Sequence, residues 1–184
     1  MENYIPTITD IPKCMTKMPS AWQGLDRIIK DIIIRFDVKL NVALEFGVEY
    51  GFSTSAFANY FDKVIGVDTF MGDIHTKNKT YHYESTKNNL EFWSNIDLVE
   101  SSYQDFIKKE KSKFDLIHID IVHTYKDTYK CGEWAVKHSD VVLFHDTESF
   151  KNDVGKAVKD LAIKYNLKHY NYKDCYGLGI LVNN

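Results

Sequence analysis

The feature that most constrains the fold is a regular alternation of short apolar runs and longer amphipathic segments from residue 41 onward. Apolar runs predict strands at 41–46, 63–68, 96–99, 114–120, 140–144, 167–172 and 177–182, and helical segments fall at 53–61, 84–93, 103–111, 124–137 and 150–165. Strands that alternate with helices of about 10–15 residues are typical of βαβ units and a mainly parallel sheet. The chain is therefore predicted to be an α/β protein with helices on both faces of the sheet.

The first 20 residues differ from the rest of the chain. All 3 prolines, Pro6, Pro12 and Pro19, lie in this segment, which shows little periodicity. Residues 21–36 place apolar side chains at helical spacing and predict an amphipathic helix that leads into the body. We therefore divide the chain into an irregular arm or lid, residues 1–20, and a single domain, residues 21–184.

Charge and cysteine content narrow the range of partners. The 23 Lys and Arg residues against 26 Asp and Glu give a net charge of −3, which argues against a nucleic-acid partner. No apolar run reaches the length of about 18 residues that a membrane span needs, and the N-terminus lacks a signal-peptide pattern. The 3 cysteines stand at long, irregular spacings, so we expect reduced thiols in a cytoplasmic protein.

A glycine-containing loop follows the first strand of the body. Gly47 and Gly51 let the backbone turn tightly and approach a ligand, and Ser53 could cap the helix that follows. The spacing G-x-x-x-G differs from the dinucleotide pattern and from the P-loop. Asp68 ends the next strand, where a carboxylate can accept hydrogen bonds from a ribose diol.

These residues resemble the cofactor motifs of class I S-adenosylmethionine-dependent methyltransferases. The resemblance implies a Rossmann-like, seven-stranded, mostly parallel sheet across residues 21–184, with the last strand inserted antiparallel. It also implies that Glu45 and Gly47 lie near the methionine part of the cofactor, that Asp68 binds the ribose, and that Ser102 and Tyr103 lie beside the adenine. The full predicted cofactor-binding set is Glu45, Gly47, Gly51, Ser53, Asp68, Ser102, Tyr103 and Asp120.

Acidic and histidine side chains gather at two other strand ends. Asp120 and Asp146 end adjacent strands in such a fold, so their carboxylates could converge on a hard cation such as Mg²⁺. That ion would lower the pKa of a substrate hydroxyl. His123, three residues past Asp120, could act as a general base. His118 is expected to be a packed histidine on the strand, and His145 could be either a ligand or a group that orients its neighbour.

The stretch from Phe114 to Thr147 resembles a narrower group, the small metal-dependent O-methyltransferases related to macrocin and mycinamicin O-methyltransferases and to cephalosporin-hydroxylase-type proteins. The resemblance implies that Asp120 and Asp146 are metal ligands, that Thr147 supplies a further oxygen ligand, and that His123 is the base. Three places depart from the group's pattern, because Ile121 replaces a glycine, Cys131 replaces an acid, and residues 138–140 (His-Ser-Asp) replace a Pro-Gly-Gly turn.

The sequence thus predicts an S-adenosylmethionine-dependent enzyme that methylates an oxygen of a small hydroxylated molecule with the help of Mg²⁺. Three alternatives stay open: a cofactor-binding module without methyl transfer, a metal-independent methyltransferase that uses His123 alone, and an Fe(II) oxygenase built on His118, Asp120 and His145. The arm is the candidate for covering the acceptor site or meeting a partner subunit, which leaves homo-oligomerisation open. His82 is expected on the surface, in a polar loop at 71–83.

Overall fold

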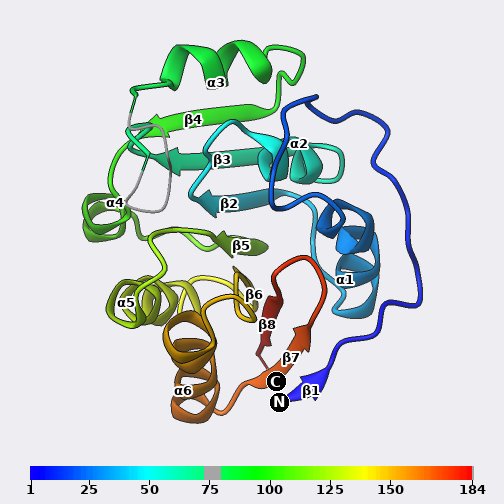
Figure 1. The fold of residues 1–184 in the computed structure, drawn as a ribbon, viewed down its shortest axis with the longest axis vertical. Coiled ribbons are helices and arrows are strands. Elements are labelled where there is room, and N and C mark those ends of the chain that lie inside the picture. Colours follow the sequence, from blue (N-terminus) through cyan, green and yellow to red (C-terminus); the bar gives the residue numbers. More distant parts are fainter. Residues whose placement is uncertain (73–79, 184) are drawn as a thin grey trace.

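A computed structural model describes residues 1–72 and 80–183 and confirms the α/β architecture (Figure 1). Within the described part of the chain, eight strands form one sheet in the order β1-β7-β8-β6-β5-β2-β3-β4. The strands are β1 (Glu2–Asn3), β2 (Val42–Phe46), β3 (Lys63–Asp68), β4 (Ile96–Glu100), β5 (Leu116–Ile119), β6 (Val141–His145), β7 (Lys168–Tyr172) and β8 (Leu178–Val182). All neighbouring strands run parallel except β8, which is antiparallel to β6 and β7, as the closeness of the last two strands in sequence predicts.

Helices cover both faces of the sheet (Figure 1). They are a 3₁₀ turn η1 (Leu25–Ile28), α1 (Ile29–Arg35), α2 (Phe52–Ala58), α3 (Tyr83–Asn89), α4 (Tyr103–Lys109), α5 (Tyr125–Ala135), a π turn η2 (Lys151–Gly155) and α6 (Lys156–Tyr165). One apolar cluster joins η1, α1 and α2 to the sheet, and a second joins α4, α5 and α6 to its opposite face. None of the helices in the described ranges is long and apolar enough to cross a membrane.

Successive side chains of β2 pack alternately into the two apolar clusters, one on each face of the sheet. Ala43 packs into the cluster with α1 and α2, whereas Leu44 and Phe46 pack into the cluster with α5 and α6. Successive side chains of a strand point to opposite faces, so an apolar run without polar interruption suits a sheet that is covered on both sides. The exception is Glu45, which is fully buried on the first face.

The structure corrects three details of the sequence prediction. The sheet has an eighth strand, because Glu2 and Asn3 in the arm pair in parallel with β7. The first helix begins at Leu25 rather than residue 21. Ser53 lies inside α2, and Gly51 occupies the N-cap position with φ of 89°. That left-handed backbone conformation is accessible to glycine without a steric penalty, which explains why the loop turns there.

The arm is held against the body by one buried carboxylate. Asp31 of α1 is 1% exposed. It accepts hydrogen bonds from the Tyr4 hydroxyl at 2.5 Å, from the Thr7 amide and hydroxyl at 3.0 and 2.8 Å, and from the Ile8 amide at 2.9 Å. Arg35, one helical turn on, lies 3.0 Å from the same carboxylate. The beginning of the arm is therefore an ordered part of the domain.

The rest of the arm follows α2. The Cys14 backbone amide donates to Asn59 Oδ1 at 3.0 Å, and Asn59 Nδ2 donates to the Cys14 carbonyl oxygen at 2.6 Å. The Thr16 amide donates to Ser55 Oγ at 3.3 Å. These contacts bring residues 19–22 to the carboxyl ends of the strands, where the arm joins the body.

We expect Asp31→Ala to lower the free energy of unfolding by about 2–4 kcal/mol, because it leaves buried donors of the arm and the Arg35 charge without their acceptor. Urea denaturation of the full chain measures this change. Asp10→Ala is the matched control, since Asp10 pairs with Lys30 at the surface and both side chains are more than 40% exposed. Equal stability of Asp31→Ala and the unmodified chain would contradict the anchoring role.

Candidate functional site

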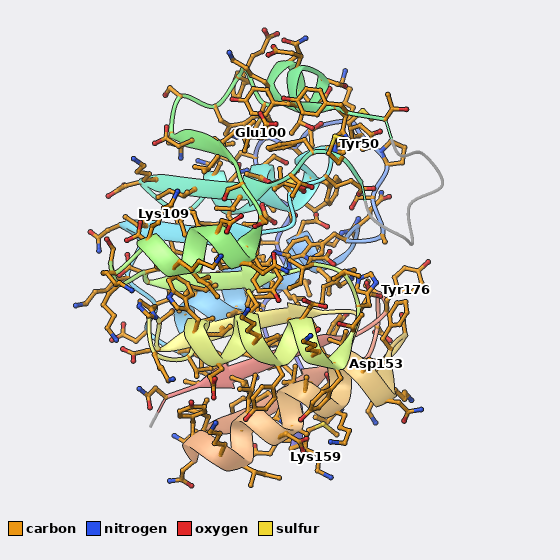
Figure 2. The ribbon with its side chains drawn as sticks, turned by 90° about the vertical axis from the view of Figure 1, so that its left-hand side faces the viewer. Tyr50, Glu100, Lys109, Asp153, Lys159 and Tyr176 are labelled. Atoms are coloured by element: carbon orange, nitrogen blue, oxygen red, sulfur yellow. The ribbon has the colours of Figure 1, made fainter. Side chains whose placement is uncertain are left out.

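A cavity of about 460 Å³ opens at the carboxyl ends of the central strands. Residues that follow β2, β3, β4, β5 and β6 form its wall, together with the residues where the arm joins the body. The lining residues include Pro19, Ser20, Ala21, Trp22, Gly47, Val48, Glu49, Tyr50, Phe52, Ser53, Asp68, His82, Ser102, Tyr103, Asp120, His123, His145 and Asp146. The strand order reverses between β5 and β2, which is where open α/β sheets bind ligands. Tyr50 lines this cavity, and Figure 2 shows it on the opposite side of the view from Lys109.

Gly47 brings the loop after β2 against the end of β5. Its φ is 89°, and a Cβ atom there would lie 1.7 Å from the Asp120 carbonyl oxygen. The Asp120 amide donates to the Phe46 carbonyl at 2.8 Å. Gly51 also has φ of 89°, and its Cβ would meet Leu90 of the α3 segment at 2.7 Å. The predicted tight turn is confirmed, and at both glycines the close neighbour is the protein itself.

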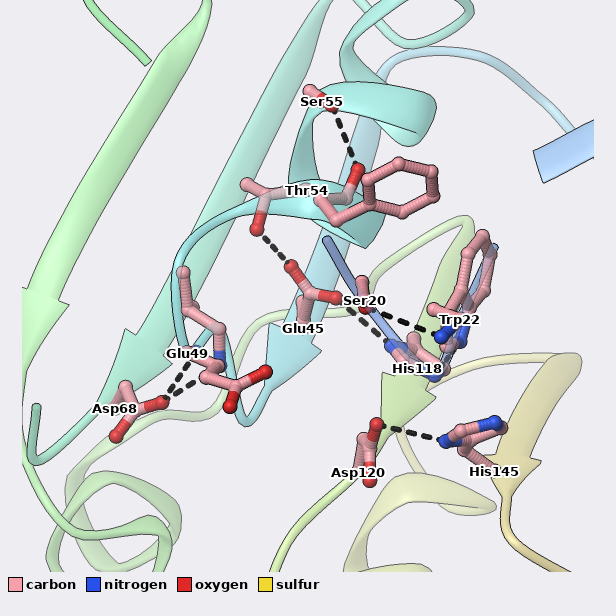
Figure 3. A network of polar contacts seen from close by, with 12 residues as sticks. Ser20, Trp22, Glu45, Glu49, Thr54, Ser55, Asp68, His118, Asp120 and His145 are labelled. Atoms are coloured by element: carbon pink, nitrogen blue, oxygen red, sulfur yellow. Dashed lines mark hydrogen bonds and ion pairs between the residues drawn. The ribbon is translucent and has the colours of Figure 1, made fainter. Parts of the chain in front are cut away.

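Asp68 binds the same loop from the end of β3. Its Oδ2 accepts from the Val48 and Glu49 amides at 2.8 and 2.9 Å, and its Oδ1 accepts from the Phe70 amide at 2.8 Å (Figure 3). The carboxylate therefore positions the glycine loop. A carboxylate offers about four lone-pair sites, so one remains on Oδ1 for a ligand in the cavity.

Glu45 lies under the cavity floor and does not line it. It stands directly opposite His118 in the parallel register of β2 and β5, and His118 Nδ1 lies 2.9 Å from Glu45 Oε1. Thr54 donates to the other carboxylate oxygen (Figure 3). Trp22 Nε1 donates to His118 Nε2 at 3.1 Å. Because an indole only donates, His118 accepts at Nε2 and carries its proton on Nδ1, toward Glu45. The packed role predicted for His118 is confirmed.

The remaining predicted cofactor residues divide in the same way. Ser53, Ser102 and Tyr103 line the cavity with Gly47, Asp68 and Asp120, whereas Gly51 lies behind the wall. Ser102 caps α4 by accepting from the Asp105 amide at 3.1 Å. The Tyr103 hydroxyl donates to Asp127 of α5 at 2.7 Å, so it points away from the cavity.

Asp120, His123 and Asp146 form one cluster on the cavity wall. His123 Nε2 lies 3.0 Å from Asp146 Oδ2 and 3.4 Å from Asp120 Oδ1. One ligand atom from each of the three residues lies within 4.8 Å of the others. His145 Nδ1 lies 3.0 Å from Asp120 Oδ2, and its Nε2 faces the Cys175 carbonyl at 3.2 Å. Both nitrogens of His145 face acceptors, so the ring holds both protons here.

Mutual neutralisation sets the charges of this cluster. Burial opposes the charged form of Asp120, but the charges and hydrogen bonds of His145 and His123 hold its pKa well below its ordinary value. Burial alone would lower the pKa of His123, but hydrogen bonds and charge attraction from Asp120 and Asp146 raise it to about 10. Burial would also lower the pKa of His145, but the charge of Asp120 raises it above its ordinary value. Two histidines thus compensate two carboxylates.

The backbone at Asp146 turns the next side chain out of the cluster. Asp146 has φ of 63°, a left-handed conformation that is uncommon for a residue with a Cβ and is often found at functional sites. Thr147 Oγ1 then donates to Asn171 Oδ1 on β7 at 2.7 Å. The structure therefore does not bring Thr147 to Asp120 and Asp146, although the three positions were predicted to form one metal site.

Sequence reasoning missed two parts of the wall. His82 was predicted on the surface, but it is only 8% exposed and lines the cavity. Trp22, expected only as an apolar helix residue, closes the side next to the arm. The aromatic residues around His82 in the sequence, Tyr81 and Tyr83, are the one feature that indicates a packed segment. Residues 73–79 of the predicted loop lie outside the described residues.

Comparison with known proteins identifies related sequences and folds. A family model described as a methyltransferase domain matches residues 44–147, which contain both the glycine loop and the acidic cluster. No curated protein matches the chain. Among solved structures, a protein described as a caffeoyl-CoA O-methyltransferase from Staphylococcus aureus is 19% identical, with a TM-score of 0.67 over 91% of this chain and 87% of that one.

Two further structures share the fold. A protein described as an O-methyltransferase from Klebsiella pneumoniae is 14% identical, with a TM-score of 0.66 over 92% of this chain and 84% of the other. An rRNA methylase from Streptococcus thermophilus is 12% identical, with a TM-score of 0.61 over 92% and 99%. Since the family model covers more than half of the chain, the protein belongs to the methyltransferase domain family, as a class I S-adenosylmethionine-dependent methyltransferase.

Proposed function

We propose that this protein transfers the methyl group of S-adenosylmethionine to an oxygen atom of a small hydroxylated molecule, with Mg²⁺ bound beside the acceptor. The observation that carries the proposal is that one cavity joins the glycine loop and Asp68 to the cluster of Asp120, His123 and Asp146. Holding the two reactants in line within such a site supplies much of the catalysis of a transfer reaction.

The cavity suits the cofactor in size and in polar groups. Its volume falls in the range of about 300–1,000 Å³ that is typical of small-molecule sites. We assign direct contact to Gly47, Ser53, Asp68, Ser102, Tyr103 and Asp120, which line it. Glu45 and Gly51 would act indirectly, because Glu45 positions His118 and Trp22 and Gly51 positions the start of α2.

The donor set of the acidic cluster suits a hard divalent cation. Carboxylate oxygens are the protein ligands that Mg²⁺ prefers, and Asp120 and Asp146 would supply them. A bound Mg²⁺ lowers the pKa of a hydroxyl group that coordinates it. Thr147 is not part of this assignment, because its hydroxyl is engaged with Asn171.

His123 is the group placed to take the proton from the acceptor hydroxyl. Its ring stacks on Phe150, with centroids 4.4 Å apart, so its orientation is defined. Hydrogen bonds and charge attraction from two carboxylates raise its pKa in the cluster to about 10, against the effect of burial. A divalent cation on those carboxylates would oppose the imidazolium charge, so we propose that the base becomes active when the metal is bound.

The wall next to the arm favours a compact acceptor. Pro19, Ser20, Ala21 and Trp22 narrow the cavity, and the chain has a net charge of −3. We therefore propose a small-molecule acceptor, although one of the structures with this fold is an rRNA methylase. Unpaired Cys14, Cys131 and Cys175 support a cytoplasmic location. Transfer of labelled methyl groups to a panel of sugars, catechols and RNA oligonucleotides, with and without chelator, tests the assignment.

We expect Asp120→Ala to abolish Mg²⁺-dependent methyl transfer and to leave S-adenosylhomocysteine affinity within about two-fold, because the carboxylate binds the metal more than the cofactor. Turnover and calorimetric binding are measured on the same preparation. Asp140→Ala is the matched control, since Asp140 lies at the opposite, amino end of β6, where its side chain accepts a hydrogen bond from Asn183. Full turnover by Asp120→Ala would overturn the metal assignment.

We expect Asp68→Asn to weaken S-adenosylhomocysteine binding by about 10- to 100-fold, because hydrogen bonds to an ionised acceptor contribute about 1.5–3 kcal/mol. Calorimetry provides the dissociation constant. Asp97→Asn on β4 serves as the control, because Asp97 is an exposed partner of Lys63 and lies outside the cavity. An unchanged constant for Asp68→Asn would remove Asp68 from the cofactor site.

In chelator, we expect His123 to keep its proton through neutral pH and to lose it near pH 10. A histidine with a raised pKa stabilises the fold fully below its ordinary pKa of about 6.5, and this contribution disappears as the pH rises toward 10. Added Mg²⁺ should move the midpoint down. Imidazole NMR follows both titrations, and His169, whose pKa burial lowers to about 4, is the internal control. A His123 midpoint that ignores Mg²⁺ would contradict metal binding by its carboxylate partners.

A further inference from the structure

His82 is a buried histidine in the wall of the cavity. The residue is 8% exposed, lines the cavity, and precedes α3. Its Nδ1 lies 3.0 Å from the Thr80 carbonyl oxygen, which can only accept. The proton therefore sits on Nδ1, and Nε2 of the neutral ring is an acceptor. Among the described residues this buried Nε2 has no hydrogen-bond partner.

The ring that carries this atom is firmly held. It packs against Tyr50 at a centroid distance of 4.8 Å and against Phe70 at 5.9 Å. The His82 amide donates to the Phe70 carbonyl at 2.9 Å. A buried polar atom without a partner is unfavourable, so an unpaired Nε2 in the cavity wall indicates a ligand that supplies the missing donor.

The same segments hold the carboxylate of Asp68. Phe70, which bonds to His82, donates its amide to Asp68 Oδ1, and Glu49, next to Tyr50, donates its amide to Asp68 Oδ2. Tyr81 donates to Glu100 at 2.9 Å, and Glu100 is the register partner of Asp68 on β4. The segment with His82 thus crosses the carboxyl ends of β3 and β4, beside Asp68.

Asp68 alone does not have enough free acceptor sites for a ribose diol. Three of its roughly four lone-pair sites accept backbone amides, so one hydroxyl can bind Oδ1 and the second needs another acceptor. We propose that His82 Nε2 accepts the second ribose hydroxyl of the bound cofactor and so completes a two-residue diol site with Asp68. This inference rests on the proposed cofactor site and assigns a residue to its ribose end.

The test compares S-adenosylhomocysteine with its 2′-deoxy, 3′-deoxy and N6-methyl analogues by calorimetry. With the unmodified chain, loss of the hydroxyl that faces His82 should weaken binding by about three- to ten-fold, the contribution of one neutral hydrogen bond. His82→Phe keeps an aromatic ring against Tyr50 and Phe70 but lacks the acceptor. It should weaken S-adenosylhomocysteine binding by a similar factor and no longer discriminate against that deoxy analogue.

Two controls separate this inference from the assignment on which it rests. His138→Phe replaces a histidine that stacks on Trp134 away from the cavity, with centroids 4.0 Å apart, and should bind all ligands as the unmodified chain does. If the unmodified chain binds S-adenosylhomocysteine and His82→Phe binds it equally well, the role of His82 is wrong. If His82→Phe instead loses discrimination against the N6-methyl analogue, the donor is the adenine amine and the ribose assignment is overturned. No binding by the unmodified chain would contradict the cofactor site itself.

The analogue series also protects the test against a folding defect. The comparison of the deoxy analogues on the unmodified chain needs no substitution at position 82. If Asp68 accepts one ribose hydroxyl and no residue accepts the other, only one of the 2′-deoxy and 3′-deoxy analogues binds more weakly than S-adenosylhomocysteine. Such a result would overturn the two-residue site whether or not His82→Phe is stable.

Discussion

The contact between β2 and β5 is the constraint on which the rest of the site depends. These strands are hydrogen-bonded neighbours at the point where the sheet reverses its order, and Gly47 lets the loop after β2 lie against the Asp120 carbonyl. A side chain at position 47 would force the two strand ends apart. The glycine loop and the first carboxylate of the acidic cluster are therefore adjacent as a direct result of strand pairing. The same pairing sets Glu45 opposite His118 and so links the floor of the cavity to Trp22.

Charge compensation is the second organising constraint. Two carboxylates that stand close together in a partly buried wall repel each other, and the protein offsets this with His123 and His145. His145 is anchored by the Cys175 carbonyl beneath the cluster, whereas His123 lies at the cavity wall. His145 thus compensates charge from beneath the cluster, and His123 compensates it from the cavity side; under the proposed function, a bound cation would take over the role of His123.

The sequence predicted the parts of the site that follow from strand ends. Gly47, Asp68, Asp120 and Asp146 were located correctly at one edge of the sheet, because parallel strands bring their carboxyl ends together. It did not predict the direction of side chains once the backbone leaves the strand: the left-handed turn at Asp146 directs Thr147 to Asn171. Nor could hydropathy reveal that Glu45 is buried, since its burial depends on partners 9 and 73 positions away in sequence.

The arm shows why local sequence is a weak guide to a segment's role. Residues 1–20 lack periodicity because they form little regular structure of their own, yet Tyr4 is 2% exposed and Asp31 accepts the arm's amides and hydroxyls. Their order comes from tertiary hydrogen bonds, which a pattern of apolar residues does not record. Since Trp22, which follows this segment, is bonded to His118, the arm is coupled through Glu45 to the strand that precedes the glycine loop. The cavity wall next to the arm is therefore built on the same strand pair as the glycine loop, so a change in the arm that keeps this wall in place must preserve the bond between Trp22 and His118.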